Sequence, residues 1–184
     1  MRADNLYFIA IIPKRELRYK IHLLKEDFAA RFNSRKALKV YPHITLKSPM
    51  KCPAEEHDNL LSWFKTSIID ETSFAIELKD FGAFHNKSNP VVFVNPVESK
   101  ALRLLQKQIV SSLKSLMPQY ITPVDEHFHP HMTIAYRDLS PDNFEQAWLE
   151  YRDKKFSDIF EIDAVHLLQH DTRKWNIIAT RNLF

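Results

Sequence analysis

The sequences PHITL at residues 42–46 and PHMTI at residues 130–134 are two copies of one pattern, in which proline precedes a His-x-Thr set among apolar residues. The two histidines, His43 and His131, lie 88 positions apart (131 − 43). Successive side chains of a β-strand point to opposite faces, so the histidine and threonine of each copy share one face. Each copy therefore predicts a strand that buries its aliphatic face and presents an imidazole and a hydroxyl on the other.

The elements around these two strands predict an α+β fold. A helix is expected before each strand, over residues 14–32 and 98–116, and Ser-Pro follows each strand. The apolar stripe of the first helix is expected to consist of Leu17, Ile21, Leu24 and Phe28. Two closing strands are expected near residues 160–168 and 174–180. Helices alternate with strands, but adjacent strand pairs also occur, which favours α+β over a doubly wound parallel sheet. We expect one pseudosymmetric domain over residues 1–184, with two lobes and a central cleft.

Composition excludes several classes of function. The chain has 184 residues, of which 45% are hydrophobic, enough for one packed core. Its net charge of +3 is compatible with an anionic ligand but too small for a protein that coats long nucleic acid. The single cysteine, Cys52, rules out an internal disulfide and a multi-cysteine zinc site. The single glycine, Gly82, leaves no glycine-rich phosphate loop, dinucleotide fingerprint or Gly-x-Ser-x-Gly elbow.

No segment of the sequence predicts contact with a membrane. The apolar run at residues 6–12 is short and ends at Pro13, which is typical of a first strand rather than a signal peptide. Apolar segments also stay well below the roughly 18–20 residues that a membrane span needs. We therefore expect a cytoplasmic monomer.

The two patterns together fit the cleavage of a phosphodiester, especially a 2′,3′-cyclic phosphate. One imidazole can take a proton from the attacking water while the other gives one to the leaving oxygen, without a metal or cofactor. His43 and His131 are the candidates for these roles. Thr45 and Thr133 can donate hydrogen bonds to the non-bridging oxygens, where negative charge builds up.

Four further residues are candidates for substrate binding. Lys47 and Arg137 follow the two histidines at even offsets, so in regular strands they would share the cleft face and neutralise phosphate charge. Phe84 and Tyr136 are candidates for stacking on a base.

The sequence resembles the 2H phosphoesterase superfamily, within it the 2′-5′ RNA ligase or RNA 2′,3′-cyclic phosphodiesterase-like proteins. The resemblance rests on the opening strand 8–13, the two His-x-Thr segments 43–47 and 128–135, and the Gly-x-Phe segment 81–84. It implies two lobes, each an antiparallel sheet with outer helices, and motifs that face a central groove. It implies that the substrates are RNA ends or small nucleotide phosphodiesters, with 2′-5′ ligation as a related activity. It also implies His43 as proton donor and His131 as proton acceptor.

Departures from the family pattern leave the substrate open. Residues 89–94 lack the arginine that many cyclic phosphodiesterases of the family carry there, and residues 168–171 with Trp175 replace a glycine-rich, tyrosine-containing closing pattern. Two other functions remain as alternatives. One is a non-catalytic module that binds nucleotides or RNA ends in the same cleft. The other is a zinc hydrolase built on His127, His129 and His131.

Overall fold

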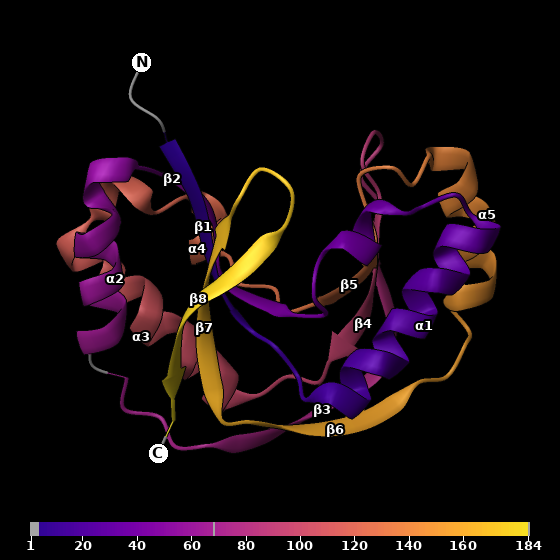
Figure 1. Cartoon of the computed structure of the whole chain (residues 1–184). Coiled ribbons are helices and arrows are strands. Elements are labelled where there is room, and N and C mark those ends of the chain that lie inside the picture. Colours follow the sequence, from indigo (N-terminus) through magenta and orange to yellow (C-terminus); the bar gives the residue numbers. More distant parts are fainter. Residues whose placement is uncertain (1–3, 68, 184) are drawn as a thin grey trace.

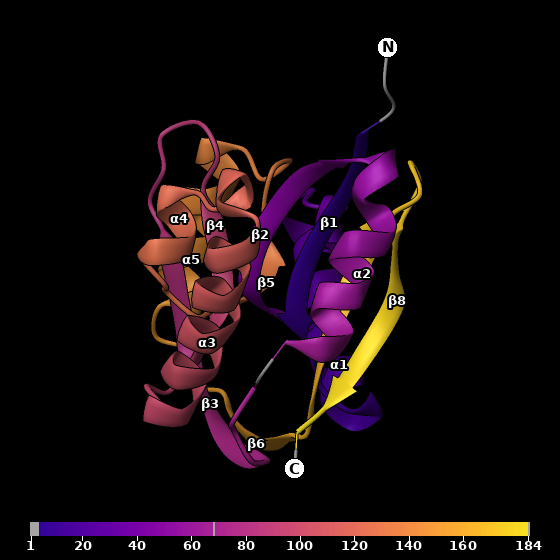
Figure 2. The ribbon, with the colours of Figure 1, turned by 90° about the vertical axis from the view of Figure 1, so that its left-hand side faces the viewer.

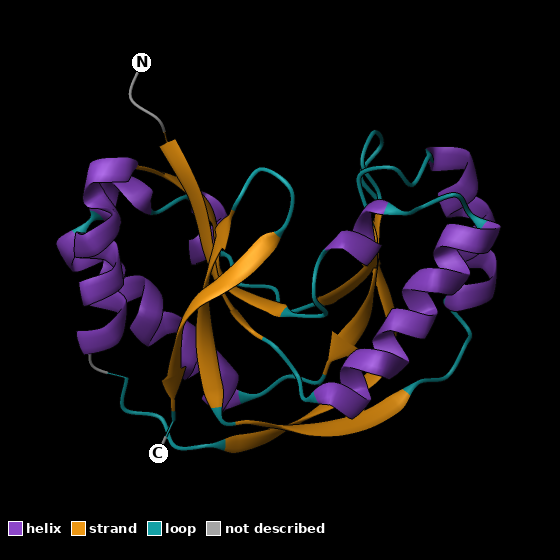
Figure 3. Cartoon of the chain, viewed as in Figure 1, coloured by secondary structure: helices purple, strands orange, loops and turns teal. Residues whose placement is uncertain are grey.

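The structure is a computed structural model that describes residues 4–67 and 69–183. The strands in these residues are β1 (Asp4–Ile11), β2 (Ile44–Pro53), β3 (Phe74–Phe84), β4 (Val91–Pro96), β5 (Met132–Ala135), β6 (Ser157–Ile162), β7 (Ala164–His170) and β8 (Trp175–Asn182). The helices are α1 (Arg15–Arg31), α2 (His57–Thr66), α3 (Lys100–Leu116), α4 (Pro123–Glu126) and α5 (Pro141–Tyr151), with short 3-10 turns η1 (Lys36–Lys39), η2 (Ala54–Glu56) and η3 (Pro118–Tyr120). Figure 3 shows most of the helices on two outer sides, with strands between them.

Within the described residues, the strands form two antiparallel four-stranded sheets. Sheet A has the order β2-β1-β7-β8 and sheet B the order β5-β4-β3-β6. The strands that carry the two His-x-Thr patterns, β2 and β5, are edge strands, and they contact each other at the centre of the molecule (Figure 1). The predicted α+β fold of two sheets with outer helices is confirmed.

The two halves of the chain exchange helices. Helix α1 follows β1 of sheet A but packs against β5 of sheet B, whereas α3 follows β4 of sheet B but packs against β2 of sheet A. In Figure 2 the helices of sheet A, α2 and α3, lie in front. Trp63 Nε1 in α2 donates to Ser112 Oγ in α3 at 3.0 Å, and Tyr151 in α5 donates to Asp27 in α1 at 2.7 Å. Each His-x-Thr strand is thus covered by the helix that precedes the other one.

Both His-x-Thr strands have the predicted alternation of side chains. Ile44 and Leu46 are buried in β2, and Met132 and Ile134 are buried in β5. The histidines, which directly precede the strands, and the threonines between these aliphatic residues are only partly buried. The core therefore fixes one face of each strand, and the other face is left for the cleft.

Within the described ranges, no helix is long and apolar enough to cross a bilayer.

One expected strand is wrong. Residues 160–168 do not form a single strand, because β6 ends at Ile162 in sheet B and β7 begins at Ala164 in sheet A. Between them, the carbonyl of Asp163 accepts a hydrogen bond from the backbone N–H of Leu183 at 2.8 Å. The buried positions change phase at the break, from Phe160 and Ile162 in β6 to Val165 and Leu167 in β7. The residue between the strands is an aspartate, which is depleted in strands.

The buried stripe of α1 also differs from the expectation. The helix buries Leu17, Ile21, Lys25 and Phe28. Lys25 therefore takes the place expected for Leu24, which lies partly buried beside the core. Adjacent residues of a helix are about 100° apart around its axis, and the apolar face of a helix is at least about that wide. Either residue can therefore lie at the edge of the buried face. Hydrophobicity favoured the leucine, whereas the fold turns the lysine inward.

Gly82 lies where a side chain would meet an aromatic ring. It pairs with Phe93 across β3 and β4, and a Cβ added at this position would fall well inside the van der Waals contact distance of the Phe93 ring. The Phe93 ring lies 5.4 Å from the ring of His131. We expect Gly82→Ala to displace Phe93 and to lower the free energy of unfolding by about 1–3 kcal/mol, measured by chemical denaturation.

A second variant separates this clash from a general effect on the strand. We expect the double variant, Gly82→Ala with Phe93→Leu, to lose less unfolding free energy than the sum of the losses in the two single variants. The smaller leucine side chain leaves room for the methyl group of the alanine. A Gly82→Ala protein as stable as the wild type would contradict the explanation.

Candidate active site

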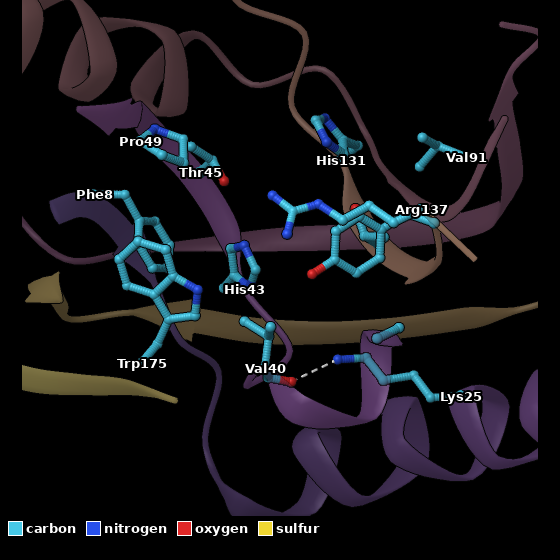
Figure 4. Close-up of a pocket in the computed structure, with 13 residues that line it drawn as sticks. Phe8, Lys25, Val40, His43, Thr45, Pro49, Val91, His131, Arg137 and Trp175 are labelled. Atoms are coloured by element: carbon cyan, nitrogen blue, oxygen red, sulfur yellow. Dashed lines mark hydrogen bonds between the residues drawn. The ribbon is translucent and has the colours of Figure 1, made fainter. Parts of the chain in front are cut away.

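A pocket of about 210 Å³ lies between the two His-x-Thr strands. His43 and Thr45 line it from the side of β2, and His131 and Thr133 line it from the side of β5. Figure 4 shows His43, Thr45 and His131 around the same space. The four residues selected from the sequence as catalytic candidates therefore lie together, although they come from two sheets.

Both imidazoles are held in the same way. His43 Nδ1 lies 2.6 Å from the carbonyl oxygen of Tyr41, and His131 Nδ1 lies 2.8 Å from the carbonyl oxygen of His129. A carbonyl can only accept a hydrogen bond, so Nδ1 carries the proton in each ring. Each neutral histidine therefore keeps Nε2 as a free acceptor, and each protonated histidine carries an additional N–H at Nε2. This bond to a carbonyl two residues earlier also fixes the orientation of each ring.

Burial makes both imidazoles harder to protonate. It lowers the pKa of His43 to about 4, and the nearby charges of Lys25 and His131 act in the same direction, against the hydrogen bond to Tyr41. Burial likewise lowers the pKa of His131, although the bond to the His129 carbonyl opposes it. Burial thus favours the neutral form of both rings in the free protein. A bound phosphate would raise both pKa values, because a nearby anion stabilises an imidazolium.

The two threonines offer hydroxyl groups that the protein does not use. Thr45 and Thr133 are partly buried and line the pocket. In the part of the chain that the structure describes, neither hydroxyl has a hydrogen-bonding partner. Both remain available to donate to a ligand between the strands.

Arg137 and Tyr136 reach the same pocket by a different route from the one predicted. Strand β5 ends at Ala135, and Arg137 has a left-handed backbone with φ of 63°. The even-offset argument for a regular strand therefore does not apply to it. The guanidinium group lies 5.2 Å from the centre of the Tyr136 ring, and Figure 4 shows it between the two histidine rings. Arg137 is exposed, so its charge can meet an entering anion.

The prediction that Lys47 shares the cleft face is wrong. Its side chain is fully buried, and its ammonium group lies 3.0 Å from a carboxylate oxygen of Asp125. The cause is in the pairing of β1 with β2, where the register shifts between Ile9 and Ala10 and breaks the alternation after Thr45. A sequence offset cannot reveal such an irregularity. Lys47 links β2 to α4 instead of meeting a substrate.

Phe84 lies on the far side of His131 from this pocket. Its ring meets the His131 ring edge-on at 5.1 Å, and it lines a neighbouring groove with Phe128 and His129. Thr45 and His131 border both spaces. Phe84 therefore packs against the His131 ring in the free protein and can meet only the part of a ligand that extends into the groove.

Sequence reasoning missed two aromatic residues of the pocket. The Phe8 ring lies 5.1 Å from the His43 ring, and the Trp175 ring meets Phe8 edge-on at 4.5 Å. Both residues line the pocket. Phe8 lies in an apolar run that is typical of core, and Trp175 was noted only as a departure from the family pattern, so neither was predicted to line the site. Together they form an apolar wall beside His43.

The pocket also contains Lys25, another residue that was not predicted. Its side chain is 2% exposed, and its ammonium group donates to the carbonyl oxygen of Val40 at 2.9 Å. The sequence does contain a signal, a lysine one position away from the expected apolar stripe of α1, but such lysines usually extend to solvent.

The three histidines considered as zinc ligands do not converge. Across residues 4–67 and 69–183, no three His, Cys, Asp or Glu side chains are arranged to hold a metal ion. His127 and His129 are exposed, whereas His131 turns its Nδ1 to the backbone. The arrangement does not fit a zinc site at these residues.

Comparison with known proteins agrees with this geometry. The profile of the 2′-5′ RNA ligase superfamily matches residues 13–174. The chain belongs to this superfamily of 2H phosphoesterases. Membership supports a phosphoesterase or RNA ligase-like function. A Bacillus cytotoxicus protein that carries the provisional name phosphoesterase is 27% identical over 176 residues, which is 95% of each chain.

Solved structures of similar fold cover nearly the whole chain. TT0787 of Thermus thermophilus has a TM-score of 0.71 at 19% identity and covers 97% of both chains. LigT of Escherichia coli, in a complex with 3′-AMP, has a TM-score of 0.66 at 20% identity over 98% of this chain and 99% of LigT. At these identities the likeness establishes the fold of this 2H protein and not its substrate.

Proposed function

We propose that this protein is a metal-independent phosphodiesterase that hydrolyses 2′,3′-cyclic phosphate ends of RNA or nucleotides. The observation that carries the proposal is the pair of imidazoles, His43 and His131, which line one pocket from opposite strands and present Nε2. Two proton-transfer groups on two sides of one space are what in-line displacement at phosphorus requires. A binding module would not need them.

The reaction follows from this arrangement. Neutral His131 accepts a proton from water at Nε2 as the water oxygen bonds to phosphorus. Protonated His43 donates its Nε2 proton to the ribose oxygen as the bond between that oxygen and phosphorus breaks. The assignment of donor and acceptor follows the family resemblance, since the two rings have equivalent bonding. Thr45 and Thr133 donate to the non-bridging oxygens, and Arg137 offsets their charge.

The same groups can direct a different nucleophile to the phosphorus. When the 5′-hydroxyl of an RNA replaces water, the acceptor histidine takes its proton as the 5′ oxygen bonds to phosphorus. The donor histidine protonates the 3′ oxygen as its bond to phosphorus breaks, and the product is a 2′-5′ linkage. LigT in its 3′-AMP complex shows that a protein of this fold binds a nucleotide, and this supports a nucleotide or RNA end as the ligand here. Ligation is therefore part of the proposal, as the same displacement at phosphorus with an RNA hydroxyl in place of water.

Turnover of a short RNA that ends in a 2′,3′-cyclic phosphate, with chelator present, tests the proposal. We expect a monophosphate product, and phosphorus NMR would identify which ribose oxygen leaves. Tight binding of the RNA without turnover of any phosphodiester would instead establish the non-catalytic module.

The pH dependence is a second expected outcome. Catalysis needs one neutral and one protonated histidine, and kcat/KM reports the pKa values of the free enzyme. Because burial lowers the pKa of both His43 and His131, the singly protonated form is most populated below pH 6.5. We expect kcat/KM to peak on the acidic side of pH 6.5 and to fall as pH rises. The kcat profile should lie at higher pH, since bound phosphate favours the imidazolium. A kcat/KM that stays constant up to pH 8 would contradict this.

A further inference from the structure

The described chain has two buried lysines, which differ in what balances their charge. Lys47 has a carboxylate partner in Asp125. Lys25 donates one hydrogen bond to the carbonyl of Val40, and among residues 4–67 and 69–183 it forms no ion pair with a carboxylate. Only one of the three N–H donors of its ammonium group is therefore used by the protein.

A buried ammonium group without an opposite charge destabilises a protein. Burial lowers the pKa of Lys25 to about 8, so most molecules still carry the charge at pH 7. The opposite charge could come from a ligand, because Lys25 lines the same pocket as the two histidines. An anion held there would satisfy both the charge and the unused donors.

The position of Lys25 points to a particular part of the ligand. In Figure 4, Lys25 and Thr45 lie on opposite sides of the His43 ring. Phe8 and Trp175 lie on one side of the His43 ring in Figure 4 and Lys25 on the other, while the Arg137 guanidinium group lies between the two histidine rings. The reacting phosphate is placed by the histidines and the threonine hydroxyls. A group bound at Lys25 would lie on the other side of the His43 ring from Thr45.

We propose that Lys25 binds a second phosphate group of the substrate, one nucleoside away from the phosphate that reacts. This rests on the function proposed above and specifies its substrate class. A cyclic phosphate at the end of an oligonucleotide has such a group in the preceding linkage, whereas a mononucleoside 2′,3′-cyclic phosphate has none. Lys25 thus favours RNA ends over free cyclic mononucleotides.

Direct binding tests this without turnover. Calorimetry would compare adenosine 3′-monophosphate, adenosine 3′,5′-bisphosphate and the dinucleotide ApAp on the wild type, Lys25→Met and Lys39→Met. Lys39 is an exposed lysine of η1 outside the pocket, so its variant matches the change in net charge. We expect the second phosphate to tighten binding about tenfold in the wild type and Lys39→Met, and less than about twofold in Lys25→Met.

Two controls address folding. Lys25→Met removes a buried charge, so the Tm of the free protein should not fall. Lys25→Gln removes the charge but keeps a donor for Val40, and it should lose the same binding advantage. If Lys25→Met does not fold, Lys25→Gln gives the answer.

The outcomes separate the alternatives. Equal weakening of the monophosphate and the bisphosphate in the Lys25 variants would place Lys25 at the reacting phosphate and overturn the proposal. Unchanged binding of all three ligands would make Lys25 a structural residue and also overturn it. Tightening by the bisphosphate but not by ApAp would assign the site to a terminal phosphate and reject the preference for RNA ends. Failure of cyclic-phosphate turnover alone would reject the proposed reaction and leave these binding differences intact.

Discussion

His43→Ala and His131→Ala are each expected to lower kcat/KM for a 2′,3′-cyclic phosphate by about 10²–10⁴-fold. Each variant removes one of the two proton-transfer groups that present Nε2 to the pocket. Each ring is held by a hydrogen bond to the backbone only two residues away, so its removal breaks no long-range contact of this kind. The measurement is steady-state kinetics on a cyclic-phosphate-ended RNA, with chelator present.

A matched variant controls for the loss of a histidine as such. His22 lies on α1, outside the pocket, with a side chain that is 45% exposed. His22→Ala should keep wild-type kinetics, and all three variants should keep a Tm close to that of the wild type. Substantial turnover in both His43→Ala and His131→Ala would exclude the two-histidine mechanism.

Asp125→Ala is expected to cause the largest loss of stability, about 3–5 kcal/mol. The carboxylate of Asp125 accepts hydrogen bonds from the backbone N–H groups of Ser48 and Thr122, both at 2.8 Å, and pairs with Lys47. Truncation leaves the Lys47 ammonium group buried without its charge partner. In thermal denaturation, each kcal/mol corresponds to about 2–4 °C in Tm for a chain of this size.

A double variant distinguishes the orphaned charge from the lost hydrogen bonds. Lys47→Met combined with Asp125→Leu removes both charges, and it should recover a large part of the stability lost in Asp125→Ala. A loss below about 1 kcal/mol in Asp125→Ala would show that the pair does not hold β2 to α4.

The pattern at residues 42–46 and 130–134 predicted the strands, their buried faces and the meeting of four site residues. It could do so because alternation depends only on the local backbone and on the burial of aliphatic side chains. The residues that the sequence misplaced depend on longer-range geometry. Lys47 was moved into the core by a register shift between two strands, and no local pattern records such a shift.

The cationic end and the apolar wall of the pocket were missed for a different reason. Lys25, Phe8 and Trp175 come from a helix and two strands that are far apart in the sequence. Each has an ordinary explanation in its own segment as a helix lysine or a core aromatic. Only the packing of α1 against the opposite sheet brings Lys25 to the histidines, and this packing is a property of topology rather than of composition.

The exchange of helices between the two halves has a mechanical consequence. Because α1 and α3 each cross to the sheet of the other half, two segments of the chain bridge the cleft in opposite directions. Hinge opening in the manner of a clamshell would have to peel both helices from their sheets. We expect the distance between the two imidazoles to be preorganised before any ligand arrives. Substrates would then enter through the open face of the cleft, with little energy spent on closure.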